Sequence, residues 1–291
     1  MKKIVLLFLV VLAGVASCSS VHGSSGKEKI SYHKTRSTPS HTIKIPVSWE
    51  MMKIANYTAL DVEYSIKSDG QVVISGPEDV IDKIWIEEKG ATLNIRVKPD
   101  VQRVNLSGVK VKVYLPDLNE MTLYGSGDFI ADRLSTTTLG LNILGSGDIS
   151  AGSIDATSMK LMIRGSGDVK VNKIACTNLQ FLTQGSGDVV VKEIESTLTK
   201  VNVQGSGDIL VDRLVTARAE ALVQGAGDVT FHGLNVTNFQ ATVQGSGDIT
   251  ADGEVFSATM TVQGTGSINA RKLKCDRVSK NKYGAGDIYT Y

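Results

Sequence analysis

Apolar and polar residues follow one period through the C-terminal part of the chain. The tetrapeptide Gly-Ser-Gly-Asp, or a close variant, begins nine times between Gly125 and Gly284. The spacing is 20 residues, except for 19 residues between Gly245 and Gly264. With the first glycine as position zero, position four is apolar in every copy: Phe129, Ile149, Val169, Val189, Ile209, Val229, Ile249, Ile268 and Ile288. Positions six and nine are also apolar in most copies, and an alternating run such as Leu139-x-Leu141-x-Ile143 precedes the next motif.

Alternation with period two, in β-branched and aliphatic residues, predicts strands with one buried face. One repeat cannot bury its own apolar face, whereas stacked repeats bury equivalent residues against each other. Antiparallel pairing would place unlike columns together. The sequence therefore predicts an all-β fold, a parallel β-helix (β-solenoid) of about nine 20-residue coils over 125–291. The general preference for right-handed crossovers favours a right-handed helix.

The repeated motif is interpreted as a turn. Glycine would supply a positive φ at a sharp corner, and aspartate would bind backbone amides near the turn. The predicted turn residues are Gly125, Asp128, Gly145, Asp148, Gly165, Asp168, Gly185, Asp188, Gly205, Asp208, Gly225, Asp228, Gly245 and Asp248. Calcium is the alternative, because glycine–aspartate nonapeptide repeats bind it, but here the period is 20 and the partner motif is missing. We expect no metal site, and no need for calcium in folding.

Stacking has two further consequences. The aspartates would form a column of like charges about 4.8 Å apart, either solvated and bound to amides or with a cation between some of them. A second polar column precedes the motif and consists of Gln184, Gln204, Gln224, Gln244 and Gln263. Stacked amides of this kind predict a hydrogen-bonded ladder along the solenoid.

Residues 40–124 lack the repeat and contain both tryptophans, Trp49 and Trp85. Strand-like segments cover 60–66, 72–74, 84–87, 93–97 and 109–115, with a hairpin turn at 88–90 and a short helical turn beginning at Pro77. A solenoid needs its open end covered, so this region is interpreted as irregular opening coils and a cap. Its aromatic residues fit packing better than a sugar-stacking platform.

The first 18 residues have the pattern of a targeting segment. Lys2 and Lys3 precede an apolar run, 4–12, that is too short to span a bilayer. Gly14-Val15-Ala16-Ser17-Cys18 resembles the lipobox of bacterial lipoproteins, which predicts a lipid on Cys18; an ordinary secretory signal is the alternative. Residues 19–39 are rich in Ser, Lys and His and are interpreted as a flexible tether.

Cys176 and Cys275 each lie eleven residues after the first glycine of a motif, so they share a column. They belong to the third and eighth coils, and five coil steps separate them by about 24 Å. A disulfide needs Cα atoms within about 7 Å. We therefore expect both thiols to be reduced.

The composition favours no enzyme class. The formal net charge is +1, so nothing in the overall charge indicates a nucleic-acid partner. Three of the four histidines lie in or next to the tether, and His232 stands alone in an outward polar position. Coil length hardly varies, so no long loops build a cleft, and a carboxylate repeated in nearly every coil is unlike a single catalytic acid. We expect no catalytic residues and no cofactor; a glycan-degrading β-helix enzyme is the alternative.

The chain resembles a known family in several segments. They are the lipoprotein-like start, Ser-Asp-Gly-Gln-Val-Val-Ile at 68–74, Gly-Ala-Thr-Leu-Asn-Ile-Arg-Val-Lys at 90–98, and Val-Tyr-Leu-Pro-Asp-Leu at 113–118 leading into the first motif. Together they resemble the DUF2807 family, described as autotransporter adhesins with a head GIN domain, of Bacteroidetes. The resemblance covers about 40–291 and implies a β-helical fold and a cell-envelope location.

The expected function is therefore non-catalytic: a lipid-anchored, adhesin-like binding or scaffold protein that presents a rigid solenoid surface. Its expected partners are the membrane, through the N-terminal lipid, and a glycan or protein ligand, with no nucleic acid. The location would be the outer membrane, on its periplasmic or surface side. A purely structural envelope component is a third reading. The sequence leaves the ligand, the binding face and the oligomeric state open.

Overall fold

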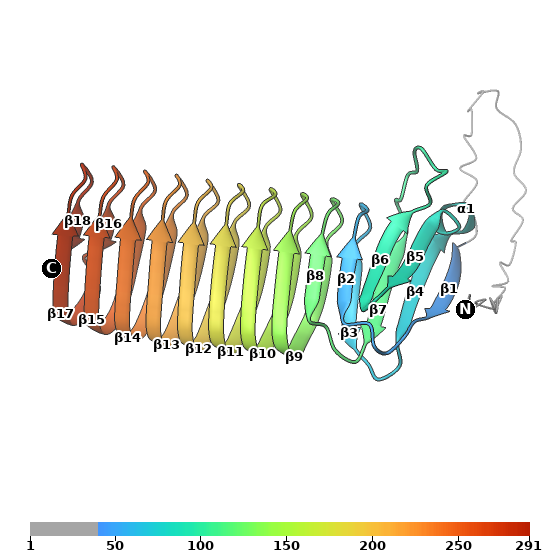
Figure 1. Cartoon of the computed structure of the whole chain (residues 1–291), viewed down its shortest axis with the longest axis horizontal. Coiled ribbons are helices and arrows are strands. Elements are labelled where there is room, and N and C mark those ends of the chain that lie inside the picture. The colour runs from blue at the N-terminus through green and yellow to red at the C-terminus, as the bar shows by residue number, and fades with distance from the viewer. Residues whose placement is uncertain (1–39) are drawn as a thin grey trace, which may run out of the picture.

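A computed structural model describes residues 40–291, which form an elongated β-solenoid with a mixed β cap at its N-terminal end (Figure 1). The predicted signal segment, the lipidated Cys18 and the tether lie outside the described residues. One buried apolar cluster runs from Val47 in the cap to Leu273 near the C-terminal end of the solenoid, so the cap and the solenoid share a core.

The repeat region forms the regular part of the solenoid. Its long strands are β9 (Phe129–Ile143), β10 (Ile149–Ile163), β11 (Val169–Thr183), β12 (Val189–Val203), β13 (Ile209–Val223), β14 (Val229–Val243) and β15 (Ile249–Val262). The last coils contain β16 (Ile268–Ala270), β17 (Leu273–Lys282) and β18 (Ile288–Thr290). Neighbouring coils pair in parallel and in register, as in Ile149 with Val169. The predicted parallel β-solenoid is confirmed.

The apolar columns form the core. Position four is fully buried from Phe129 to Ile268, and the columns that begin at Leu139, Leu141 and Ile143 line the opposite wall. Phe181 and Phe231 are completely buried in these walls. Each strand therefore wraps around the coil and presents apolar residues inward at both of its ends. The coil between Gly245 and Gly264 is one residue shorter than the others. The pairing of β14 with β15 accommodates this by a register shift between Phe231 and Leu234.

The N-terminal region contains a coil that the repeat does not reveal. Its elements are β1 (Ser40–Pro46), β2 (Lys53–Asn56), β3 (Val62–Ile66), β4 (Gln71–Pro77), α1 (Glu78–Ile81), β5 (Ile84–Lys89), β6 (Thr92–Val97), β7 (Lys110–Leu115) and β8 (Glu120–Leu123). β2 pairs in parallel with β8, and β3 pairs in parallel with the start of β9. The solenoid stack thus begins at β2, before the first glycine-containing motif.

The remaining N-terminal strands close the open end. β6 and β7 pair in parallel with β2 and β3, and each sheet then ends in antiparallel strands: β5 beside β6, and β4 and β1 beside β7. This arrangement confirms the cap. The hairpin at 88–90 and the helical turn after Pro77 are also confirmed, and Gly90 has the positive φ, 59°, that such a turn uses. β1, β2 and β8 are strands that the sequence reading missed.

The other end of the stack is covered differently. β17 pairs with β15 on one side, and among residues 40–291 no other strand has a paired register with β17. Lys280 and Lys282 stand opposite Met260 and Val262, two fully buried core residues. Inward-pointing charge on an edge strand opposes further strand addition, since another layer would have to bury the ammonium groups.

Candidate binding groove

The repeated turns stack so closely that their glycines leave no space for a side chain. A Cβ on Gly205 would lie 2.0 Å from the carbonyl oxygen of Gly185, and one on Gly207 would lie 2.1 Å from that of Gly187. None of the motif glycines has a positive φ; Gly90, Gly108, Gly233 and Gly253 are the described glycines that do. The predicted reason for these glycines is therefore wrong. Close approach between turns requires them, not the turn conformation.

The motif aspartates form hydrogen bonds between neighbouring turns. One carboxylate oxygen of Asp188 accepts the backbone N–H of Asp208 at 2.7 Å, and this contact repeats from Asp61 to Asp248. Each carboxylate from Asp61 to Asp248 thus accepts a hydrogen bond from the coil that follows, rather than from within its own turn. Within residues 40–291, no group of three or more His, Cys, Asp or Glu side chains is arranged to hold a metal ion.

The predicted glutamine ladder is present. The amide nitrogen of Gln184 donates to Gln204 at 2.7 Å, and the chain of bonds continues through Gln224 and Gln244 to Gln263. Arg164 extends it by donating its Nε to Gln184. Each glutamine amide is hydrogen-bonded to the amide of the next coil, so the ladder stabilises the stack. Few of its donors and acceptors remain free for a ligand.

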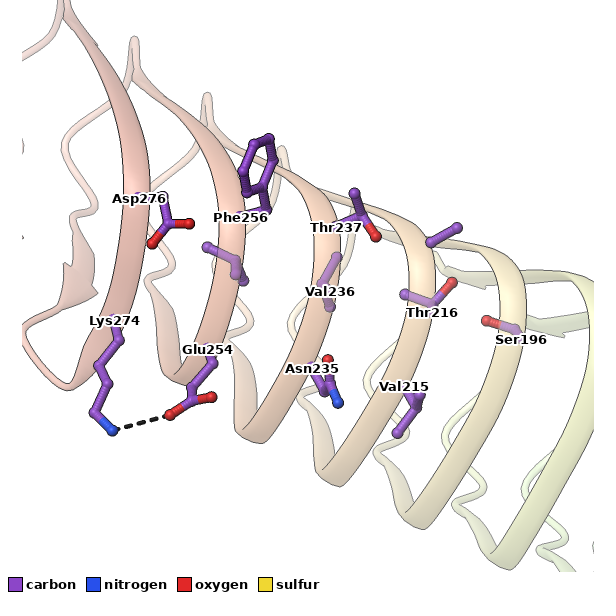
Figure 2. Close-up of a pocket in the computed structure, with 12 residues that line it drawn as sticks. Ser196, Val215, Thr216, Asn235, Val236, Thr237, Glu254, Phe256, Lys274 and Asp276 are labelled. Atoms are coloured by element: carbon purple, nitrogen blue, oxygen red, sulfur yellow. Dashed lines mark hydrogen bonds and ion pairs between the residues drawn. The ribbon is translucent and has the colours of Figure 1, made fainter.

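A concave surface lies elsewhere, where each long strand bends between its two buried ends. The same three consecutive positions on neighbouring coils provide its lining residues, and we call this surface the groove. Its floor consists of Thr136, Ala156, Cys176, Ser196, Thr216, Val236, Val255 and Cys275. One wall consists of Thr137, Thr157, Thr177, Thr197, Ala217, Thr237, Phe256 and Asp276. Figure 2 shows these rows on adjacent coils near the C-terminal end.

The floor is made of small residues because it lies against the bent backbone. Thr216 donates its hydroxyl to the carbonyl oxygen of Arg218 at 3.2 Å, and the thiol of Cys275 lies 2.9 Å from the carbonyl oxygen of Arg277. Val236 and Val255 are nearly fully buried at the same position. Short side chains keep the surface hollow, and the hollow opens into two cavities of about 710 Å³ and 440 Å³.

The larger cavity lies between Ser196 and Asp276 and has the most varied chemistry. Lys274 and Glu254 form an ion pair at 2.9 Å across two coils (Figure 2). This hydrogen bond raises the pKa of Lys274 and lowers that of Glu254. Phe256 is 47% exposed, and the guanidinium of Arg277 lies 5.0 Å from its ring centre. The cavity thus combines an exposed aromatic ring with paired charges and threonine hydroxyls.

Both predicted thiols lie on the groove floor, in the same column and free. The structure confirms that they do not pair. Burial raises the pKa of Cys176 to about 11, because the thiolate would lose its hydration. Cys176 is therefore protonated at neutral pH and unsuited to nucleophilic chemistry.

His232 is half exposed, and its Nδ1 lies 3.5 Å from a carboxylate oxygen of Asp252. It belongs to an outward column, as expected, and contributes nothing to the groove. The groove itself was not predicted from the sequence. Its signal is the run of small residues at position eleven, next to a threonine in most coils.

Comparison with known proteins gives the family. The family described as "Putative auto-transporter adhesin, head GIN domain" (DUF2807) matches residues 52–233 and 210–291. The chain belongs to this family. The resemblance noted in the sequence is thereby confirmed, together with the adhesin-like class that the family description gives. Among curated proteins, none matches the chain significantly.

Solved structures of similar fold come from Bacteroides and Parabacteroides species. A putative adhesin from Bacteroides fragilis is 21% identical, with a TM-score of 0.56, over 88% of this chain and 98% of that one. A putative adhesin from Parabacteroides distasonis is 17% identical, with a TM-score of 0.65, over 87% and 98%. A P. distasonis protein described as a putative lipid binding protein is 23% identical, with a TM-score of 0.55, over 87% and 96%. At these identities the likeness concerns the fold.

Proposed function

We propose that this protein is a lipid-anchored, non-catalytic adhesin-like protein whose groove binds an extended glycan. The observation that carries the proposal is the groove itself, a hollow that repeats coil after coil with a threonine wall. A repeating surface suits a repeating polymer, because five of the eight wall positions offer the same threonine hydroxyl and the first four of these lie on consecutive coils. The exposed Phe256 adds a ring that a sugar could contact at the C-terminal end of the groove.

The chemistry of the groove favours binding over catalysis. Hydrolysis of a glycosidic bond needs a general acid with a raised pKa beside a second carboxylate. Glu254 lies in the larger cavity, but its hydrogen bond to Lys274 lowers its pKa, which is the wrong direction for a general acid. Cys176 is protonated and half-buried. These properties support a binding role over the glycan-degrading alternative.

Attachment to the outer membrane through Cys18 is part of the same proposal and rests on the sequence. Among residues 40–291 no helix is long and apolar enough to cross a membrane. With the lipid on Cys18, residues 19–39 would link the membrane to the cap, and the groove would extend away from it. Several acyl chains on one residue make a stable anchor. Incorporation of labelled fatty acid into the wild type, lost in Cys18→Ala, would test this part.

The binding test uses the mature chain with Cys18→Ser on a glycan array, followed by titration of each hit. Thr237→Trp fills the larger cavity from the wall. Thr230→Trp adds the same ring near the start of β14, on the outward face and away from the groove residues, and serves as the matched control. We expect binding to fall at least roughly tenfold in the first variant and to be unchanged in the second. An equal effect of both substitutions, or cleavage of the bound glycan, would contradict the proposal.

A further inference from the structure

A separate hollow of about 410 Å³ lies where the cap meets the solenoid. It opens on the outer face of the sheet formed by β6, β2 and β8, and we call it the junction pocket. Ala55 lies in its centre, between Asn94 on β6 and Thr122 on β8. A short side chain flanked by longer ones creates the hollow. Its volume is within the usual range for small-ligand sites.

The floor of the junction pocket is polar although it is buried. Asn94 is 4% exposed and Thr122 is 7% exposed. Asn94 donates its side-chain amide to the carbonyl oxygen of Glu87 over 3.4 Å, a long bond, and the hydroxyl of Thr122 accepts from Asn142 at 3.3 Å. Burying polar groups costs free energy unless good partners are present. Core packing alone gives no reason for an amide and a hydroxyl here, whereas a polar ligand does.

Arg96 contributes the strongest indication of a ligand. Its Nε is buried and has no hydrogen-bond partner within the described residues. No ion pair between Arg96 and a carboxylate forms among residues 40–291 either. The guanidinium lies over the ring of Tyr57, 4.2 Å from its centre. A buried, unpartnered guanidinium nitrogen in a pocket wall is expensive, and an anionic ligand would offset that cost.

The aromatic stack holds this guanidinium in place. Tyr57 and Tyr124 are stacked with ring centres 4.4 Å apart and planes within 4°. One face of Tyr57 is covered by Tyr124 and the other by Arg96. A sugar ring therefore cannot stack on Tyr57, and the pocket must recognise its ligand by charge and hydrogen bonds. The planar guanidinium matches a carboxylate, with which it forms two parallel hydrogen bonds.

Charge agrees with this geometry. Lys53, Lys89 and Arg96 line the pocket, against one lining carboxylate, Glu120. Glu120 is already paired with Lys53 at 2.7 Å, so Lys89 and Arg96 provide the cationic character. Glu87, next to Asn94 on the same face of the hairpin, is the other nearby carboxylate. Glu87 does not line the pocket, but its negative charge reduces the net positive charge around it.

We propose that the junction pocket binds a carboxylate-bearing sugar. Arg96 and Lys89 receive the carboxylate, while Asn94 and Thr122 bind ring hydroxyl groups. An apolar ligand would add no hydrogen bond to the buried polar floor, and a neutral sugar would leave the charge of Arg96 without a counter-charge. The site lies on other residues than the groove and stands independently of the function proposed for the groove.

The test is calorimetric titration of the mature Cys18→Ser protein with galacturonic acid, with galactose and with inorganic phosphate. We expect galacturonic acid to bind roughly tenfold or more tightly than galactose, which lacks the carboxylate, and more tightly than phosphate. Equal affinity for the two sugars, or preference for phosphate, would overturn the proposal. Thr237→Trp, which fills the groove, leaves this binding unchanged if the two sites are separate.

Two variants locate the site. Arg96→Gln removes the guanidinium, and Lys89→Gln removes the second cation at the exposed hairpin end, where the fold does not depend on it. We expect each to weaken binding of galacturonic acid roughly tenfold. Arg164→Gln is the matched control, because it removes one arginine from the same outward row and extends the glutamine ladder. Wild-type affinity in Arg96→Gln and Lys89→Gln, with melting temperatures unchanged, would refute the assignment.

Discussion

The turn at residues 57–62 and the turns of the repeat occupy the same place in the coil, yet only the repeat turns need glycine. Asp61 bonds to the amide of Asp128, as the repeat aspartates bond to one another. Tyr57 stacks on Tyr124 in the row that later holds the glutamines. At the two glycine positions, however, the first turn has Thr58 and Leu60.

The difference follows from what lies on the cap side of each turn. A Cβ on Gly127 would point at the carbonyl oxygen of Leu60, 2.1 Å away, because a turn already occupies that side. The segment that follows β6 leaves the stack, and Lys98 bonds to the carbonyl oxygen of Lys83 in the cap. Leu60 therefore has room, and its side chain is buried in the shared core. Glycine is required by the neighbouring turn, not by the turn itself.

The strongest test of this comparison is Gly205→Ala. Its Cβ would meet a backbone carbonyl oxygen that cannot move without displacing the next turn. We expect a loss of at least about 3 kcal/mol in the free energy of unfolding, measured by denaturant titration. Ser206→Ala is the control, since Ala226 and Ala285 occupy that position naturally. If Gly205→Ala were as stable as Ser206→Ala, close stacking would not explain the glycines.

The converse substitution is Leu60→Ala in the first turn. Here the side chain fills the core under the cap, so we expect truncation to cost about 2 to 4 kcal/mol through lost burial and a residual cavity. The same measurement applies. A cost below about 0.5 kcal/mol, the usual range for surface positions, would mean that the cap does not pack on this turn.

The two ends of the stack can be compared in the same way. The cap covers one end, and Lys280 and Lys282 protect the other. Replacing both with valine would leave an apolar parallel edge, for which we expect concentration-dependent self-association. Sedimentation velocity of the double variant, against Lys170→Val with Lys192→Val on an outward face as control, measures it. A monomeric double variant at high concentration would show that the lysines do not guard this edge.

A smaller effect is expected in the aspartate column. Asp188→Ala removes the acceptor for the N–H of Asp208 and should cost about 1 kcal/mol. Asp188→Asn keeps an acceptor oxygen and removes one of a row of like charges, so its stability should equal or slightly exceed that of the wild type. Thermal unfolding of the pair separates hydrogen bonding from charge. Equal destabilisation by both would mean that the negative charge itself is needed.

The smallest effect is expected from calcium. The carboxylates are already bonded to amides from Asp61 to Asp248, so a chelator should leave the melting temperature unchanged. Circular dichroism with and without chelator, and with added calcium, measures this. A marked loss of stability on chelation would place a cation in the aspartate column after all.

Repetition in the sequence made the solenoid predictable. Columns such as Ile149 over Val169 identify which residues stack, since only in-register parallel coils place like on like. The glutamine ladder, the unpaired thiols and the hairpin at 88–90 were predicted because each depends on that spacing or on local turn chemistry. The aspartate position was also readable, although its partner proved to be the next coil.

The tertiary structure alone decided the contacts between segments that are far apart in the sequence and do not belong to the repeat. After β3 the chain runs through the cap, where β6 and β7 pair with one side of β2 and β3, and it reaches the other side of β2 only at β8. The pairing of Ile54 with Met121 therefore has no periodic signal. The arrangement of Arg96 on Tyr57 and Tyr124 depends on that return. The groove likewise arises from the bend of each strand, which side-chain periodicity does not encode. Spacing along the chain fixes which residues stack, whereas the path of the backbone fixes which surfaces remain hollow.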